Sequence, residues 1–379
     1  MKFISLQENL KKGLNTTGHA TSKNVNLPIL NNILIKAFQG DIELISTNLE
    51  IGVNYKIRGK VEEEGEFTVD SKLITEYVNL LNSGEKVSID QKEGELSIEC
   101  GNYKTKMKGE SAKDFPLIPT IPEENPFSFS ISEFKKALNS IVFAVSTSEN
   151  RLELTGVLFS FSGKKLDLAA TDSYRLAEKT LNIEGGDNED EHGNEKEEIK
   201  IIVPSKTVQE LLRILNNFDG NNDNGEIKIY LSENQILFTF DSVSLISRLI
   251  NGHYPDYKQI IPTTSKTKAL IKKTELTRAV KAAALFSKTG VNDIFLQFSK
   301  GKVVVSAFSG ASGESLIKVE AETEGEDNEI TINHRYLLDG LNNIDSDLVR
   351  VIVLNDNSPC LLKAEKDDDY LYIVMPIKS

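Results

Sequence analysis

The chain has 379 residues, more than one hydrophobic core usually spans, so its length favours two or three domains. Hydrophobic residues make up 39% and charged residues 27%, which excludes a disordered chain. Charge appears early at the N-terminus and no apolar run reaches 18 residues, so secretion and membrane spanning are not expected. Two cysteines are too few for a disulfide framework, and a cytoplasmic protein is predicted.

The net charge of −13 at first disfavours a nucleic-acid partner, because phosphate contacts need a basic surface. Three acidic segments, 62–66, 184–198 and 322–329, together carry −16, so the remainder of the chain is +3. Exposed charges farther apart than about 8 Å are largely screened from each other. A mildly basic face is therefore compatible with this composition.

The first third of the chain predicts two helices and two pairs of strands. A helix with the buried stripe Leu6, Leu10 and Leu14 follows a capping-box spacing from Ser5 to Glu8. A second helix follows Lys72, because apolar residues there recur at spacings of three and four. The apolar runs of the strands are 33–38 and 42–45, separated by a turn at Gly40, and then 87–89 and 96–98.

The middle and last thirds repeat this order. In the middle third, a helix around Phe134 starts at a capping-box spacing from Ser130 to Glu133, and a second helix follows Lys206. In the last third, helices are predicted around Leu276 and after Arg335. The apolar runs of the strands are 157–161, 166–168, 227–230 and 236–240 in the middle third, and 294–298, 303–305, 349–353 and 361–362 in the last third.

A period near 130 residues relates the three thirds. Aligned on Lys72, Lys206 and Arg335, each copy has an acid four residues later and aliphatic residues at plus six and plus nine. The three acids are Glu76, Glu210 and Asp339. We therefore predict an α+β fold of three repeated domains, residues 1–122, 127–250 and 253–379, each with two helices packed on antiparallel sheet. The Pro-containing segments 114–126 and 252–264 are the expected linkers.

Several segments along the chain form a recognisable series by their order and spacing: Leu27-Pro28-Ile29-Leu30, Thr47-Asn48-Leu49-Glu50, Asp114-Phe115-Pro116, residues 154–159 and 170–177, Ile202-Val203-Pro204, Tyr254-Pro255-Asp256-Tyr257 and Val374-Met375-Pro376-Ile377. Through them the chain resembles, over its whole length, the bacterial DNA polymerase III beta subunit, the replicative sliding clamp. The resemblance implies a head-to-tail dimeric ring of six domains around duplex DNA. Such a ring holds DNA by topology and needs only weak, sequence-independent phosphate contacts.

The resemblance makes basic residues on the helices candidates for DNA contact. Lys72, Lys206 and Arg335 fall in the first turns of their helices, where the helix dipole disfavours a cation by roughly a few tenths of a kcal/mol. Either the acid four residues later offsets this cost, by about 0.3 to 0.5 kcal/mol, or a DNA phosphate does. Further candidates are Lys11, Lys12, Lys135, Lys136, Arg278 and Lys281, together with Lys23 and Asn24, where the family carries a DNA-contacting arginine that this chain lacks.

The resemblance also implies a hydrophobic groove between the middle and last domains that takes short peptides from the polymerase, the clamp loader and repair and mismatch proteins. We call the matching residues the candidate peptide surface: Arg151, Leu154, Thr171, Ser173, Tyr174, Arg175, Leu176, Pro255, Ile260, Ile373, Val374, Met375, Pro376 and Ile377. Alternatively, Leu371, Ile373 and Met375 are simply alternate positions of a final edge strand. Ser173-Tyr174 departs from the smaller or imidazole-bearing residues usual in the family.

Closure of the ring would bring Thr105 and Met107 of one copy against Leu285 and Phe286 of the other, as the resemblance implies. The lysines at 104, 106 and 108 make the first of these edges less apolar than expected. The acidic segment 184–198 is expected to be a solvated loop on the outer rim, because acids in the bore would repel phosphate.

An enzyme is not predicted. The four histidines have no spacing that pairs them with Cys, Ser or carboxylates as a triad or metal site, so no cofactor and no metal are expected. Gly310-Ala311-Ser312-Gly313 is too short for a phosphate-binding fingerprint. Without the resemblance, the three repeats would indicate a protein-interaction scaffold that does not encircle DNA.

Overall fold

The computed structural model describes residues 1–22, 26–183, 198–218 and 225–378. The chain divides into two compact units, and each is described by itself. The N-terminal unit comprises Met1–Ser132 and Gln209–Leu249, and the C-terminal unit comprises 133–183, 198–208 and 250–378. The central repeat predicted from the sequence therefore contributes to both units.

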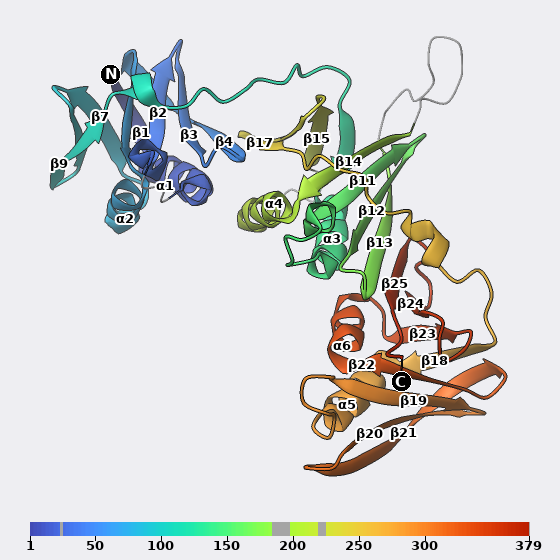
Figure 1. The fold of residues 1–379 in the computed structure, drawn as a ribbon. Coiled ribbons are helices and arrows are strands. Elements are labelled where there is room, and N and C mark those ends of the chain that lie inside the picture. Colours follow the sequence, from blue (N-terminus) through green and yellow to red (C-terminus); the bar gives the residue numbers. More distant parts are fainter. Residues whose placement is uncertain (23–25, 184–197, 219–224, 379) are drawn as a thin grey trace, which may run out of the picture. The chain divides into compact units, whose positions relative to one another are not determined.

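The N-terminal unit is built on one antiparallel sheet (Figure 1). Its strands, in spatial order, are β10 (Phe127–Ser130), β15 (Glu226–Leu231), β16 (Gln235–Phe240), β17 (Val243–Arg248), β4 (Ile51–Ile57), β3 (Asp41–Thr47), β2 (Asn32–Phe38), β6 (Gly65–Asp70), β9 (Tyr103–Glu110), β8 (Glu95–Cys100), β7 (Lys86–Lys92), β1 (Lys2–Leu6) and β5 (Gly59–Glu63). The pairing of β4 with β17 joins the first repeat to the second.

The C-terminal unit is built on a second antiparallel sheet. Its strands, in spatial order, are β14 (Ile199–Pro204), β11 (Gly156–Ser162), β12 (Lys165–Thr171), β13 (Arg175–Asn182), β25 (Tyr370–Val374), β24 (Cys360–Ala364), β23 (Leu348–Val353), β18 (Thr267–Lys272), β21 (Gly313–Gly325), β20 (Lys302–Ser309), β19 (Asp293–Ser299) and β22 (Asn328–Asn333). The pairing of β13 with β25 joins the second repeat to the third.

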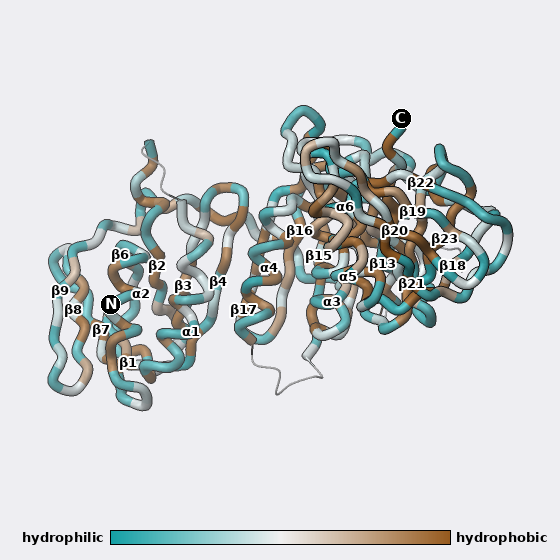
Figure 2. The backbone as a smooth tube through the Cα atoms, turned by 90° about the horizontal axis from the view of Figure 1, so that it is seen from below, coloured by the Kyte–Doolittle hydropathy of each residue, from teal (hydrophilic) through white to brown (hydrophobic). Residues whose placement is uncertain are grey.

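Six α-helices occur in the described part of the chain, two in each repeat: α1 (Gln7–Thr17), α2 (Ser71–Leu80), α3 (Ile131–Ile141), α4 (Ser205–Asn217), α5 (Lys273–Ala284) and α6 (His334–Asn343). Helix α1 packs beside α2 and on β3 and β4, whereas α5 packs beside α6 and on β20 and β21. Figure 2 shows hydrophobic stretches along the strands and helices and hydrophilic residues at many of the turns. In the first and third repeats, the helix pair thus packs on the strands of its own sheet.

The predicted hairpins are confirmed. In all three repeats the strands join through a two-residue turn, closed by Phe38–Asp41, Ser162–Lys165 and Ser299–Lys302. Gly40, Gly163 and Gly301 occupy these turns at φ of 88°, 52° and 79°. This left-handed conformation is open to glycine without steric cost.

One local expectation, the Ser5 cap, and one alternative, the final edge strand, were wrong. The Ser5 side chain does not cap α1; its hydroxyl donates to the carbonyl of Arg58 at 2.7 Å, and Leu6 is the N-cap residue without a side-chain bond. The last strand is not an edge strand with alternating exposure either. Strand β25 lies between β13 and β24, and all five of its residues are buried. Its continuous apolar run is typical of a strand buried on both faces.

The first expected linker is part of the core. Phe115 packs in a cluster with Ile29, Leu34 and Ile45, while Ile121 packs with Tyr230, Leu237 and Ile246. The segment therefore covers the sheet of the N-terminal unit around the junction of β4 and β17.

Candidate DNA-facing residues and peptide surface

The three aligned cations occupy the same position in their helices. Lys72, Lys206 and Arg335 are each the second residue of α2, α4 and α6, and each side chain is exposed. Asp70 caps α2 by accepting from the backbone N–H of Leu73 at 2.7 Å. Asn333 caps α6 by accepting from the backbone N–H of Arg335 at 2.9 Å. The structure thus confirms the first-turn placement that the sequence predicted.

The ion pairs expected four residues later form in only one of the three helices. Lys72 lies 3.8 Å from Glu76, and both side chains are largely exposed, so this pair contributes little. The carboxylate of Glu210 instead accepts from the guanidinium of Arg213 at 2.6 Å. The carboxylate of Asp339 pairs with Arg175. The ion-pair explanation is therefore wrong for Lys206 and Arg335.

The other basic candidates are distributed over the first helix of each repeat. Lys11, Lys136, Arg278 and Lys281 are exposed, whereas Lys135 is half-buried. The ammonium of Lys12 lies 4.0 Å from the centroid of the Phe218 ring, and Arg278 is 3.9 Å from Glu275. Lys23 and Asn24 lie outside the described residues, as does the acidic segment up to 197.

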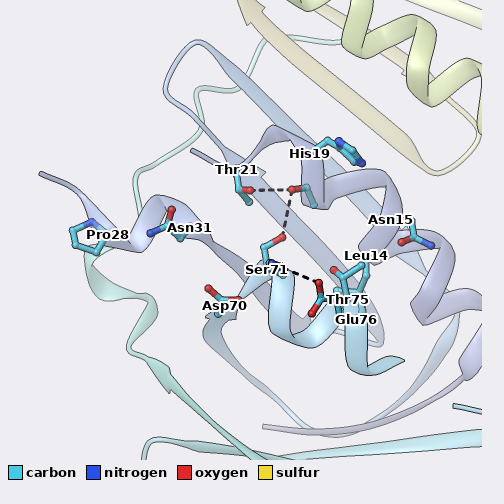
Figure 3. A pocket seen from close by; sticks show the side chains of 12 residues that line it. Leu14, Asn15, His19, Thr21, Pro28, Asn31, Asp70, Ser71, Thr75 and Glu76 are labelled. Atoms are coloured by element: carbon cyan, nitrogen blue, oxygen red, sulfur yellow. Dashed lines mark hydrogen bonds and ion pairs between the residues drawn. The ribbon is translucent and has the colours of Figure 1, made fainter. Parts of the chain in front are cut away.

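A cavity of about 740 Å³ lies beside Lys72 at the start of α2 (Figure 3). His19 and Asn15 line it from the end of α1, and Ser71 and Thr75 line it from α2. The hydroxyl of Ser71 donates to the carbonyl of Gly18 at 3.4 Å and ties the two helix ends together. Lys72, with its exposed ammonium, therefore follows a residue that is hydrogen-bonded to the end of the first helix.

The candidate peptide surface consists of a buried floor and an accessible rim. The floor residues have side chains that are at most 5% exposed: Leu154, Thr171, Leu176, Ile373 and Val374. The rim residues are exposed or half-buried: Arg151, Ser173, Tyr174, Arg175, Pro255, Ile260, Met375, Pro376 and Ile377. Tyr174 and Ile260 are 63% and 38% exposed, so they are the large apolar side chains of this set that a ligand can reach.

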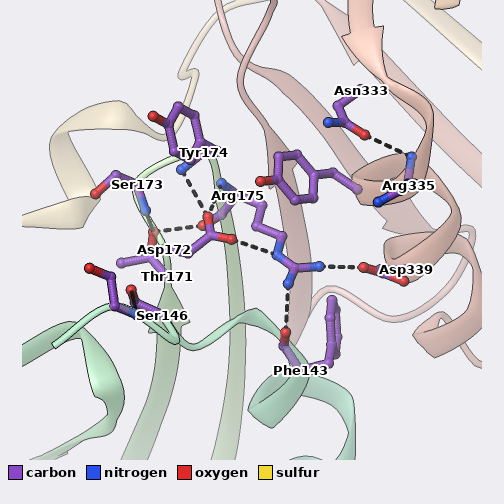
Figure 4. A network of polar contacts seen from close by, with 12 residues as sticks. Phe143, Ser146, Thr171, Asp172, Ser173, Tyr174, Arg175, Asn333, Arg335 and Asp339 are labelled. Carbon is purple, nitrogen blue, oxygen red and sulfur yellow. Dashed lines mark hydrogen bonds and ion pairs between the residues drawn. The ribbon is translucent and has the colours of Figure 1, made fainter. Parts of the chain in front are cut away.

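The turn between β12 and β13 shapes the rim. The hydroxyl of Thr171 donates to the carbonyl of Arg175 at 2.6 Å, and Asp172 accepts from the backbone N–H groups of Tyr174 and Arg175. Ser173 has φ of 79°, which a non-glycine residue rarely adopts. These bonds hold Tyr174 outward, as Figure 4 shows.

The first repeat contains the same turn, since the hydroxyl of Thr47 donates to the carbonyl of Ile51 and Asn48 accepts from the backbone N–H of Glu50. Leu49 takes the place of Ser173 with φ of 76°.

Arg175 connects this turn to the third repeat (Figure 4). Its guanidinium donates to Asp172 at 3.0 Å, to Asp339 on α6, and to the carbonyl of Phe143 at 2.9 Å. It also lies 4.8 Å from the ring centroid of Tyr336. The side chain is only 13% exposed, so its main role is to connect the two repeats, and little of it is available to a ligand.

The segment after β25 continues the rim. The backbone N–H of Met375 donates to the carbonyl of Tyr174 at 2.9 Å, and that of Ile377 donates to the carbonyl of Thr331 at 2.8 Å. Tyr174 stacks on Tyr336 with ring centroids 6.3 Å apart. Sequence reasoning missed Tyr336 and Leu152, which is 58% exposed, because each reaches the surface only through the tertiary fold.

The residues expected at ring closure differ in accessibility. Met107 is only 4% exposed and Thr105 is half-buried, whereas Leu285 is 76% exposed and Phe286 is half-buried. Met107 is buried because it faces Leu96 across the pairing of β8 and β9. On the same strand Tyr103 is an accessible apolar side chain, 48% exposed, and Leu80 at the end of α2 is 77% exposed.

Among the described residues, no group of three or more His, Cys, Asp or Glu side chains could hold a metal ion. Burial raises the pKa of the Cys100 thiol to about 11 and that of Cys360 to about 12, so both stay protonated at neutral pH. No helix within the described ranges is long and apolar enough to cross a membrane.

Three tandem α+β repeats, each contributing two helices, define the class of three-domain replication clamps. Family models of the DNA polymerase III beta subunit match the whole chain: the N-terminal domain over residues 1–119, the central domain over 129–256 and the C-terminal domain over 258–378. The chain belongs to the DNA polymerase III beta subunit family. It is a sliding clamp, a processivity subunit of the polymerase holoenzyme that is itself not catalytic.

Individual relatives agree over the full length. The beta sliding clamp of Staphylococcus aureus strain Mu50 is 30% identical over 391 residues, with 100% of both chains covered. A crystal structure of the DNA polymerase sliding clamp from Pseudomonas aeruginosa matches with a TM-score of 0.92 at 27% identity, covering 100% of both chains. The sliding clamp of Bacillus subtilis matches with a TM-score of 0.91 at 26% identity, covering 100% of this chain and 99% of that one.

Proposed function

We propose that two copies of this chain close head to tail into a ring, in which the repeats 1–122, 127–250 and 253–379 are the three domains of each half. The ring encircles duplex DNA in the cytoplasm, and Lys72, Lys206 and Arg335 face the phosphates. The observation that carries this assignment is that all three cations occupy an unfavourable first-turn position, and two of them lack the acidic partner four residues later. A phosphate supplies the missing compensation.

Two open strand edges support the closure. Residues 103–108 of β9 pair with β8 on one side, whereas β6 reaches only 109 and 110. Residues 313–320 of β21 pair with β20, whereas β18 reaches only 321–325. Lys104 and Lys106 on the first strand already pair with Glu99 and Glu95 of β8. We infer that the two edges pair between copies, because unpaired backbone groups favour strand addition.

Exposed apolar side chains occur in the two repeats that carry these edges. Tyr103 lies on β9, Leu80 is the last residue of α2, and Leu285, Phe308 and Leu316 belong to the third repeat. Phe308 and Leu316 are 62% and 65% exposed and lie on β20 and β21. Burial of such apolar side chains is the main favourable contribution to the association of two chains.

The rim formed by Tyr174, Ile260 and Met375 is proposed to hold short peptides from the polymerase catalytic subunit, the clamp loader and repair and mismatch proteins. A flexible thioether beside aromatic and aliphatic side chains accommodates different apolar anchors. The Tyr174–Tyr336 stack gives this chain an aromatic edge in the rim. Peptide preference is therefore expected to depend on Tyr174.

The DNA assignment is tested by changing Lys72, Lys206 and Arg335 together to Glu. The matched control changes Lys60, Lys164 and Lys302 to Glu, which alters the net charge equally with one exposed lysine from each repeat. Retention of the loaded clamp on nicked circular DNA is measured for both. We expect at least about a tenfold shorter lifetime for the first variant and little change for the control. Equal lifetimes would remove the three cations from the DNA-facing surface.

The peptide assignment is tested with Tyr174→Ala and Ile260→Ala. A fluorescein-labelled peptide with the C-terminal residues of the replicative polymerase from the same genome serves as the probe. Each variant should weaken binding by about tenfold, whereas Leu117→Ala, which removes a side chain that is 94% exposed in the N-terminal unit, should not. Unchanged binding by both variants would refute the assignment.

A further inference from the structure

One wall of the peptide surface is a segment without regular strand structure. Residues 254–261 run from Tyr254 through a short 3-10 helix, Tyr257–Ile260, and carry two rim residues, Pro255 and Ile260. A backbone bond from the N–H of Tyr257 to the carbonyl of Pro255, at 2.8 Å, makes the segment turn. Outside a sheet or a long helix, side-chain bonds to the rest of the fold help to fix the position of such a segment.

Three side chains of this segment bond to the β12–β13 hairpin. The hydroxyl of Tyr257 donates to the carboxylate of Glu178 on β13. The ammonium of Lys258 donates to Asp167 on β12 at 2.9 Å. The hydroxyl of Tyr254 lies 3.4 Å from the carbonyl of Ala169. The bonds from Tyr257 to Glu178 and from Tyr254 to Ala169 join buried or half-buried groups, whereas Lys258 is exposed.

The Tyr257 ring lies within the apolar cluster beneath the peptide surface. The side chain is 6% exposed and packs in one cluster with Leu158, Leu176, Leu361 and Ile373, and Met375 packs against the same cluster. Two of these residues, Leu176 and Ile373, are the floor of the peptide surface. A shift of the Tyr257 ring would therefore alter both the floor and the wall.

Glu178 is placed to fix that ring. Burial raises the pKa of Glu178, while the hydrogen bond from Tyr257 acts in the opposite direction by stabilising the carboxylate. Strand β13 is held on both sides, because Glu178 is opposite Ala169 on β12 and opposite Leu371 on β25. The acceptor therefore sits on a rigid part of the sheet, and the donor sits on the irregular segment.

We propose that Glu178 is a positioning residue of the peptide surface: by accepting the Tyr257 hydroxyl it holds residues 254–261 so that Pro255 and Ile260 form the wall against which an apolar peptide anchor packs. This inference rests on the proposed peptide-binding function. Glu178 itself does not touch the peptide. Its effect on affinity is transmitted through Tyr257.

The test is a double-mutant cycle with Glu178→Ala and Tyr257→Phe, using the labelled polymerase peptide. Each single variant should reduce the affinity for the peptide by about five- to tenfold, equivalent to about 1 to 1.4 kcal/mol. The double variant should bind the peptide as well as the single variant with the lower affinity. Glu178→Gln, which retains an acceptor oxygen, should bind within about twofold of the unmodified chain. Independent, additive losses, or a Gln variant as weak as the Ala variant, would overturn the proposal.

Amide hydrogen exchange provides a readout that does not depend on the peptide. Glu178→Ala should increase exchange in 254–261 and leave β12 unchanged. The matched control Asp367→Ala removes a carboxylate that bonds Lys179 on the same strand at 2.9 Å but does not contact the segment, and it should not increase that exchange. Unchanged exchange in 254–261 would overturn the proposal. If exchange responds but the unmodified chain binds no peptide, the peptide-binding function is refuted and Glu178 positions the segment for some other purpose.

Discussion

Replacement of Arg175 by Met is the most informative single perturbation of the C-terminal unit. The guanidinium makes hydrogen bonds to two carboxylates and one carbonyl that belong to the second and third repeats. Methionine retains most of the aliphatic volume but none of these donors. The substitution therefore tests whether polar bonds at this position hold two repeats together.

The expected loss follows from the exposure of each partner. A hydrogen bond to a charged group contributes about 1.5 to 3 kcal/mol. The side chain of Asp339 is 44% exposed, so water compensates for most of the free energy of its lost hydrogen bond. The side chain of Asp172 is 15% exposed, so water compensates less there. Asp172 also keeps two backbone N–H donors, which limits the cost of leaving it without Arg175. We expect a loss of about 2 to 3 kcal/mol in the C-terminal unit.

Hydrogen exchange followed by mass spectrometry measures this loss locally. Amides of β13, β25 and α6 that exchange through opening of the unit should exchange about 30- to 150-fold faster, because each 1.4 kcal/mol is a factor of ten. Peptides from 1–110 serve as the internal reference. The control Arg278→Met removes an arginine that is 79% exposed and should change exchange by less than about threefold. An effect of Arg175→Met no larger than that of the control would refute the reasoning.

Three further predictions concern packing, pH and assembly. Gly340→Ala should destabilise the C-terminal unit by about 1 to 3 kcal/mol in urea unfolding, because a Cβ atom there would lie 2.2 Å from the buried Tyr372 ring, whereas Gly310→Ala, with open space around it, should be neutral. Burial lowers the pKa of His334 from its ordinary 6.5, and the nearby charge of Arg335 lowers it further. As the pH falls, the unfolded chain therefore binds this proton before the folded chain does, so the free energy of unfolding should decrease below about pH 6.5 by up to about 1.4 kcal/mol per pH unit. The difference between the unmodified chain and His334→Asn isolates this loss. Equal pH dependence of the two chains would contradict it. Leu285→Asp should convert the dimer to monomer in light scattering at micromolar concentration, while Leu117→Asp should not, and an unchanged dimer would exclude Leu285 from the interface.

The repeats were predictable because their signals are local. Turn glycines between apolar runs predict the three hairpins, and the apolar spacing after Lys72, Lys206 and Arg335 predicts helices that the structure contains. The same applies to the exposed position of the three cations. A short-range pattern determines these features, and no distant part of the chain competes with it.

The errors arise where a distant group competes for a side chain. The Ser5 hydroxyl bonds to the carbonyl of Arg58 on a neighbouring strand instead of capping α1. Asp339 bonds to Arg175, which is 164 positions away in the chain, instead of Arg335. Neither partner can be found from spacing along the sequence. The burial of β25 is foreshadowed by a continuous apolar run, Tyr370–Val374, which disfavours the alternative of an edge strand with alternating exposure.

The central claim is that the chain holds DNA by encircling it, and linearisation of a loaded circle tests this most directly. The clamp is loaded onto a nicked circular plasmid, the plasmid is cut once with a restriction enzyme, and bound clamp is measured by gel filtration before and after cutting. We predict stable retention on the circle and loss from the linear product, because an encircling ring slides off a free end. Equal retention on circular and linear DNA would contradict encirclement and favour a scaffold that binds the surface of DNA.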